Sequence, residues 1–340
     1  MCGKAIAAQA ATLLDRLAAR SLLCSSTASA QSLHRAAAGA AGATAATVGT
    51  AATARATETT APACYLGIDP TAKSLHLGNL VGLRALALAS DCGFRPIVLL
   101  GGATGAVGDP SGRSSERKMM DDAELASNAA QIEATVRALV PGVEVVDNGE
   151  WYGRMSSIEF VRDVGRHFRV GTMLGKQMCR TRMESGAGLS YTEFSYQLFQ
   201  AYDWLHLFRE RGAAVQLGGS DQWGNLTAGL ELIRRVEVVG GDGGGDGGGE
   251  GEGEGEGQGE GKGGDSGKGE QVEEEGEEDF GFSCGAVGVT INLLTDSKGE
   301  KIGKSTLGGG GGAWLSVGPG LTSPYEMYQF LFNTVGLRWL

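Results

Sequence analysis

The sequence predicts an α/β fold with a doubly wound parallel sheet. Short apolar runs recur along the chain, each is followed by a stretch with helical periodicity, and glycine-rich or polar turns separate them. Strands that alternate with helices in this way usually form a parallel sheet through right-handed crossovers. Ligands of such folds bind beyond the carboxyl ends of the strands.

The expected elements follow one another from residue 64 onwards. Strands are expected at 64–68, 96–100, 143–146 and 215–217. Helices are expected at 75–89, 123–140, 194–211 and 225–236. Polar or glycine-rich motifs at 65–79, 101–109 and 218–222 then lie where strands end, so we expect a ligand to bind there.

The first 60 residues are expected to lie outside the packed core. Alanine, serine and threonine dominate them, and five basic residues outnumber two acidic ones. Leu13, Leu14 and Leu17 beside Arg16 and Arg20 allow only a short amphipathic turn or two. This composition is typical of an organellar transit peptide, and a disordered leader is the alternative.

A second segment, 240–279, is expected to be a disordered and solvated insertion. Glycine alternates there with Asp and Glu, and fifteen acidic residues against two lysines give it a net charge of −13. The chain as a whole carries −11, so its acidity is local to this insertion. A segment with so few apolar side chains cannot offset the conformational entropy that folding costs.

The rest of the composition excludes several kinds of protein. Six cysteines are scattered without a C-x-x-C pair, so neither a zinc site nor a disulfide framework is expected. No apolar run approaches the roughly 18 residues that a membrane span needs, so we expect no membrane segment.

The strongest local signal lies at 65–80, YLGIDPTAKSLHLGNL. An apolar strand breaks at Pro70, and a helix is expected to begin near Ser74. Free backbone N–H groups at a helix N-terminus bind anions, so phosphate is the expected ligand. His76 and Asn79 would share one face of the first turn and could touch that ligand. The alternative is that His76 only caps the helix and Asn79 lies on the surface.

Three further patterns carry polar side chains. Tyr196, Gln200 and Asp203 share one helical face, which needs hydrogen-bond partners if it is buried and is otherwise an exposed polar face. Asp109 ends the glycine-rich turn GGATGAVGDP, where an ordinary turn aspartate is the alternative. The KIGKS motif brings two lysines close together, as an exposed basic turn also would.

Four of these blocks resemble one known family, in the order in which that family carries them. HLGN resembles the HIGH signature of class I aminoacyl-tRNA synthetases, and YxGxDPTAxSLHxGN resembles its tyrosyl-tRNA synthetase form. GGATGAVGDPSGRSSER, YTEFSYQLFQAYD with LGGSDQWGN, and KIGKS match further blocks of that family. The resemblance covers about 63–334 apart from the glycine-rich insertion.

The resemblance implies a domain plan with a Rossmann-like, doubly wound catalytic domain at 61–320. A helical connective insertion at 151–190 would form the dimer interface and receive the tRNA acceptor end. Residues 321–340 would begin a helical anticodon-binding domain, which the chain leaves truncated. One departure from the family is that alanine-rich sequence stands where the family has a helix before the pocket tyrosine.

The resemblance also implies roles for individual residues. Tyrosine would be bound by Tyr65, Asp109, Tyr196, Gln200, Asp203, Gln216 and Gln222. ATP would be bound by Gly67, Asp69, His76, Gly78, Asn79, Gly219, Asp221, Lys301 and Lys304. Catalysis would fall to Thr71, His76, Asn79, Lys301, Lys304, Arg113 and Arg117. Asp203 and Tyr65 would hold the phenol hydroxyl and so separate tyrosine from phenylalanine.

The implied activity is that of a tyrosine–tRNA ligase. Tyrosine and ATP, with Mg²⁺ arriving on ATP as substrate, would give tyrosyl-adenylate, and the tyrosyl group would pass to tRNA(Tyr). We expect no tightly bound cofactor, no protein metal site and no membrane association. We do expect a homodimer in a mitochondrion or chloroplast. The alternatives are an RNA-binding or intron-splicing protein without catalysis, and a tryptophanyl enzyme or small nucleotidyltransferase.

Overall fold

A computed structural model describes residues 2–38, 61–111, 120–184, 186, 188–239, 284–295, 315 and 322–333. This part of the chain is built around one six-stranded sheet in the order β1-β6-β5-β2-β3-β4. The strands are β1 (Leu23–Ser26), β2 (Ala63–Ile68), β3 (Arg95–Leu100), β4 (Glu144–Asp147), β5 (Ala213–Gly219) and β6 (Val287–Ile291). Neighbours from β6 to β4 are parallel, and only β1 pairs antiparallel, with β6.

Helices surround this sheet and also form a separate group between β4 and β5. The first helices are α1 (Cys2–Ala18), α2 (Ala30–Ala38), α3 (Leu77–Asp91), α4 (Thr104–Val107) and α5 (Asp122–Leu139). Between β4 and β5 follow α6 (Gly149–Tyr152), α7 (Ser157–Glu159), η1 (Phe160–Val164), η2 (Gly165–His167), α8 (Val170–Gly175), α9 (Gln177–Glu184) and α10 (Tyr191–Arg211). The last are η3 (Ser220–Gln222), α11 (Trp223–Ile233), η4 (Arg234–Val239) and α12 (Pro324–Asn333).

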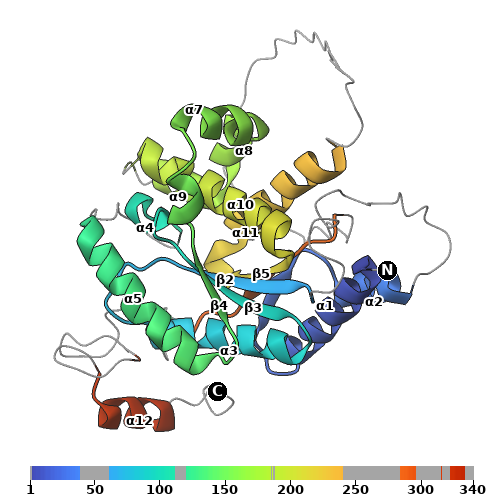
Figure 1. Cartoon of the computed structure of the whole chain (residues 1–340), viewed down its shortest axis with the longest axis vertical. Helices are drawn as coiled ribbons and strands as arrows, with labels where there is room; N and C mark the ends of the chain where they lie inside the picture. The colour runs from blue at the N-terminus through green and yellow to red at the C-terminus, as the bar shows by residue number, and fades with distance from the viewer. Residues whose placement is uncertain are drawn as a thin grey trace, which may run out of the picture.

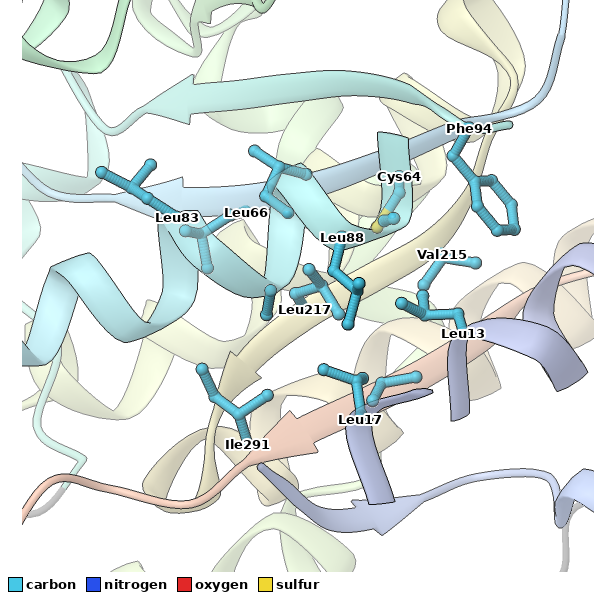
Figure 2. Close-up of a cluster of buried hydrophobic side chains, with 14 of the residues drawn as sticks. Leu13, Leu17, Cys64, Leu66, Leu83, Leu88, Phe94, Val215, Leu217 and Ile291 are labelled. Carbon is cyan, nitrogen blue, oxygen red and sulfur yellow. The ribbon is translucent and has the colours of Figure 1, made fainter. Parts of the chain in front are cut away.

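The two faces of the sheet have separate cores because successive strand residues point to opposite sides. Leu66 of β2 belongs to one core, together with side chains of α1, α3 and α5. Figure 2 shows this core, with Leu88 of α3 facing Leu13 and Leu17 of α1. Tyr65, the neighbour of Leu66, belongs to the other core, which α10 and α11 cover. Figure 1 shows α10 and α11 on one side of the strands and α3 and α5 on the other.

The doubly wound α/β fold predicted from the sequence is therefore confirmed. All eight expected strands and helices are present, with ends that differ by a few residues. The sheet is not purely parallel, because the N-terminal strand β1 adds an antiparallel edge. Short helices fill much of the chain between β4 and β5, the region that contains the predicted connective insertion 151–190.

The prediction that the first 60 residues lie outside the packed core is wrong for 2–38. Leu13, Leu14 and Leu17 of α1 are at most 2% exposed and belong to the core on the α3 side of the sheet. β1 pairs with β6, and the Asn292 side chain donates to the carbonyl of Leu23 at 3.3 Å.

Alanine explains why composition misled this prediction. Its side chain is small and has a high helix propensity, so an alanine-rich helix packs closely against a sheet although its mean hydropathy is low. Ala7, Ala10, Leu14 and Leu17 recur at helical spacing and are all nearly inaccessible. Residues 39–60 lie outside the described residues.

Other predictions also fall outside the described residues. These are the insertion 240–279, the KIGKS motif with Lys301 and Lys304, and the loop residues Arg113 and Arg117. At the C-terminal side, α12 exposes Tyr325, Tyr328 and Phe332. In Figure 1 it lies beyond α5, away from the strands.

Candidate active site

A cavity of about 500 Å³ opens at the carboxyl ends of β2 and β5, beside the N-terminus of α3. Every predicted site residue that the structure describes lines this cavity. Those predicted to bind the amino acid are Tyr65, Asp109, Tyr196, Gln200, Asp203, Gln216 and Gln222. Those predicted to bind ATP or to act in catalysis are Gly67, Asp69, Thr71, His76, Gly78, Asn79, Gly219 and Asp221. Segments distant in sequence meet here because parallel strands bring their carboxyl ends to one edge of the sheet.

One end of the cavity presents buried polar atoms from adjacent strands. Tyr65 of β2 and Gln216 of β5 are partners in the sheet register and are 1% and 2% exposed. Within the described part of the chain, neither the Tyr65 hydroxyl nor the Gln216 Oε1 has a hydrogen-bond partner. A buried polar group without a partner costs free energy, so these atoms are suited to a polar ligand.

Asp203 of α10 lies at the same end and is held by two donors from the segment after β4. Its Oδ2 accepts from Asn148 Nδ2 and its Oδ1 from Trp151 Nε1, both at 3.0 Å. Burial raises the pKa of Asp203 to about 7, although the hydrogen bonds from Asn148 and Trp151 oppose this rise. Burial and the charge of Asp203 also raise the pKa of the Tyr65 phenol, which therefore stays neutral.

A second acidic group lies further along the cavity. Asp69 accepts from Thr104 Oγ1 at 2.8 Å and from the Tyr196 hydroxyl at 3.0 Å. Asp109 accepts from the Ser111 backbone N–H at 2.9 Å and from Gln222 Nε2 at 2.7 Å. Two carboxylates in one cavity favour a cationic group of the ligand. Asp69 was predicted for the nucleotide side, and its hydrogen bonds connect it to Tyr196 of the amino-acid side.

The N-terminus of α3 forms the other end of the cavity. His76 is the N-cap residue, and its backbone N–H donates to Asn79 Oδ1 at 3.0 Å. Asn79 therefore caps the helix, and both side chains also line the cavity. A Cβ added at Gly67 would meet no atom within 4 Å, which leaves the β2 end open for a ligand. The free N–H groups of this helix end can bind an anion.

Sequence reasoning missed several residues of the site. Thr104, Ser111 and Asn148 hydrogen-bond the carboxylates described above, and Thr104 also accepts from Asn148 at 2.9 Å. Trp151, the first residue of the predicted connective insertion, was given no role in the site, but it is 7% exposed and donates to Asp203. The missed signal was the polar run directly after β4, which lies at the same edge of the sheet as the other motifs.

The described residues contain no group of three or more His, Cys, Asp or Glu side chains arranged to hold a metal ion. They also contain no helix with the length and apolar character needed to cross a bilayer.

Comparison with known proteins identifies the family. A family model described as tRNA synthetases class I (W and Y) matches residues 57–240, more than half of the chain. This chain belongs to that family. The letters W and Y stand for tryptophan and tyrosine, the amino acids whose synthetases the description covers.

Curated relatives of this class I synthetase chain are tyrosine–tRNA ligases. The enzyme from Acidothermus cellulolyticus is 41% identical over 290 residues, which are 82% of this chain and 56% of the relative. The chloroplastic/mitochondrial enzyme from Arabidopsis thaliana is 41% identical over 276 residues, which are 79% of this chain and 45% of the relative. The synthetase chain thus spans about half the length of the curated relatives that it matches.

Solved structures agree with the class I fold. A C-terminally truncated mitochondrial tyrosyl-tRNA synthetase from Aspergillus nidulans matches with a TM-score of 0.61 and 26% identity, over 98% of this synthetase chain and 81% of the other. The corresponding truncated protein from Coccidioides posadasii gives 0.58 and 25%, over 85% and 69%. The Rossmann-like class I fold predicted from the sequence is therefore confirmed.

Proposed function

We propose that this chain activates tyrosine with ATP to give tyrosyl-adenylate and pyrophosphate, and that it supplies the catalytic part of a tyrosine–tRNA ligase. The observation that carries the proposal is the buried pair of Asp203 and Tyr65 at one end of the cavity. The names of the curated relatives and of the solved structures support the choice of tyrosine.

The phenol end of the amino acid occupies the cavity beside Asp203 and Tyr65. The substrate hydroxyl donates to the Asp203 carboxylate, whose two oxygens can accept more hydrogen bonds than those from Asn148 and Trp151. The same hydroxyl accepts from Tyr65, whose own hydroxyl lacks a partner among the described residues. Phenylalanine would leave both groups unsatisfied, which is the physical basis of discrimination.

The ammonium group of the amino acid lies beside the second acidic group. Asp109, Tyr196 and Gln200 surround this position in the proposal, with the negative charge of Asp69 close to Tyr196. Gln216 and Gln222 complete the amino-acid side. The substrate carboxylate then points along the cavity towards the N-terminus of α3, where the nucleotide binds.

ATP lies over the glycine-rich strand ends. Gly67, Gly78 and Gly219 let the nucleotide approach the backbone closely, and Asp221 accepts from the ribose hydroxyls. Asp69, which accepts from the Tyr196 hydroxyl, also contacts the nucleotide in this proposal. The phosphates lie at the N-terminus of α3, beside Thr71, His76 and Asn79.

The chemistry is an in-line displacement at phosphorus. A carboxylate oxygen of tyrosine attacks the α-phosphorus of ATP, the bond to the bridging oxygen breaks, and pyrophosphate leaves with that electron pair. Magnesium arrives with ATP as part of the substrate. Donors at Thr71, His76 and Asn79 stabilise charge that develops on the phosphate oxygens. Lys301, Lys304, Arg113 and Arg117, all outside the described residues, are assigned to the leaving pyrophosphate.

The partners of the proposed ligase follow from the helices between β4 and β5. Their exposed apolar side chains, Ile158, Val161, Val170, Leu174 and Met183, suit a homodimer interface. The tyrosyl group passes from the adenylate to a terminal hydroxyl of tRNA(Tyr), whose acceptor end is held by this insertion. The mitochondrial and chloroplastic names among the relatives support an organellar location.

The experiment that tests the proposal is ATP–pyrophosphate exchange with tyrosine, tryptophan or no amino acid. Tyrosine-dependent exchange is expected, and a His76→Ala variant should lose most of it because it removes a donor to the phosphates. Exchange with tryptophan alone would assign the chain to the other branch of the family. RNA binding without any exchange would favour a non-catalytic role.

A further inference from the structure

A chain of side-chain amides runs through the site and ends on a carboxylate. Gln222 Nε2 donates to Asp109 at 2.7 Å, and Asn225 Nδ2 donates to Gln222 Oε1 at 3.2 Å. The same Asn225 NH₂ group lies 2.9 Å from Gln200 Oε1 and 3.3 Å from Ser111 Oγ, so its two N–H donors are shared among three acceptors. The other four residues line the cavity, whereas Asn225 does not and is 5% exposed.

Asp109 determines which way each side-chain amide of this hydrogen-bond series is oriented. A carboxylate only accepts hydrogen bonds, so Gln222 must turn its NH₂ group towards Asp109. Its oxygen then faces Asn225, which must present an NH₂ group in turn, and Gln200 must present its oxygen. If the Asn225 amide were reversed, its oxygen would face the oxygens of Gln222 and Gln200.

A short loop closes this arrangement. Ser111 accepts from Asn225 through its hydroxyl, and its backbone N–H donates to the second oxygen of Asp109 at 2.9 Å. Asn225 therefore supports both oxygens of the carboxylate, one through Gln222 and the other through Ser111. α11 begins directly after Gln222, so Asn225 is fixed three residues further on by helical geometry.

We propose that Asn225 is a positioning residue that transmits the polarity of Asp109 to Gln200. The relay keeps Asp109 and Gln200 presenting oxygen atoms, the acceptors that an ammonium group needs, and stops Gln200 from turning its NH₂ group towards that cation. Asn225 touches no substrate itself. The inference rests on the proposed function for the identity of the ligand, an amino acid with a free ammonium group.

The first test compares two ligands that differ only in the ammonium group. Binding of labelled tyrosine is measured by equilibrium dialysis, and 3-(4-hydroxyphenyl)propionate is measured as its competitor. Asn225→Ala should weaken tyrosine about tenfold, the effect of losing one hydrogen bond from the ammonium group to a misoriented Gln200, and should change the competitor less than about twofold. Equal weakening of both ligands, or no change in either, would overturn the relay.

The second test needs no ligand. Asn225→Asp places an acceptor at each end of Gln222, so the midpoint of thermal unfolding should fall. Adding Asp109→Asn lets the hydrogen bonds run in the opposite direction, from the amide at position 109 through Gln222 to the carboxylate at position 225. The double variant should therefore recover part of the lost unfolding midpoint. Tyrosine affinity should not return, because the carboxylate at position 109 is gone.

A matched control separates this effect from simple charge repulsion. Thr227→Asp adds the same charge two residues further along α11, where the Thr227 hydroxyl donates to the Gly224 carbonyl of its own helix at 3.1 Å. The shift in unfolding midpoint of Thr227→Asp combined with Asp109→Asn should equal the sum of the two single shifts. The relay is wrong if Asn225→Asp combined with Asp109→Asn departs from additivity no more than Thr227→Asp combined with Asp109→Asn does. If the wild-type chain binds no tyrosine but the Asn225 pair is coupled, the proposed function fails and the relay stands.

Discussion

Lowering the pH should weaken tyrosine binding through Asp203. This carboxyl group has a pKa of about 7 because burial opposes its charge. Its ionised form is the stronger acceptor for the substrate hydroxyl, because protonation adds a hydrogen to one of the two oxygens that already accept from Asn148 and Trp151. About 97% of the group is ionised at pH 8.5 and about 3% at pH 5.5, so the dissociation constant should rise about thirtyfold between them.

The assay is equilibrium dialysis of labelled tyrosine across this pH range, without ATP, so that catalytic groups do not contribute. Phenylalanine serves as the control ligand because it has no hydroxyl to donate. An Asp203→Asn variant should bind tyrosine weakly and with a flat profile. A flat profile for the wild-type chain, or the same slope for phenylalanine, would refute the assignment of Asp203 to the phenol.

The same group affects folding with the opposite sign. Its pKa is about 7 in the folded chain and about 3.9 in an unfolded one, so the folded chain binds this proton more tightly. The stabilisation from the protonated form is complete below about pH 4 and is lost as the pH rises to about 7, a change of about 4 kcal/mol for this group alone. Stability without ligand should therefore fall over the range in which tyrosine binding improves.

Three further predictions concern other parts of the chain. Tyr65→Phe should reduce kcat/KM in pyrophosphate exchange about tenfold at most for tyrosine and hardly at all for phenylalanine, because one neutral hydrogen bond is lost; equal losses would make Tyr65 structural. Trp151→Phe removes a donor to Asp203, so the pH profile of tyrosine binding should move upwards by about one unit; an unchanged profile would contradict this. Deleting 2–26 removes α1 and β1 and uncovers the core, so cooperative thermal unfolding should be lost. An unchanged unfolding midpoint would show that these residues are not needed for the fold.

Much of the fold could be predicted because its strands and helices are locally consistent. The apolar run that became β3 and the periodic stretch that became α10 needed only their own residues. The motifs also fell at strand ends, so the sheet itself brought Tyr65, Asp109 and Asp221 to one cavity. The roles of the individual site residues were predicted from the family resemblance and not from their position at strand ends.

The remaining features depend on contacts that no local pattern shows. The N-terminal helix α1 is buried because β6 and α3 offer it a surface, and alanine-rich composition does not reveal this. Asn148 and Trp151 acquire their role only when α10 brings Asp203 against them. Asn225 is one turn of helix from Gln222, but its link to Gln200 crosses between two helices.

The most direct test of the account is the wild-type ratio of kcat/KM for tyrosine to that for phenylalanine in ATP–pyrophosphate exchange. Tyrosyl-tRNA synthetase is the established example of such discrimination, at about 10⁵-fold without editing, and a site that satisfies a buried carboxylate and phenol through one substrate hydroxyl should reach at least about 10³-fold. A ratio near one would contradict the assignment of Asp203 and Tyr65 to the phenol.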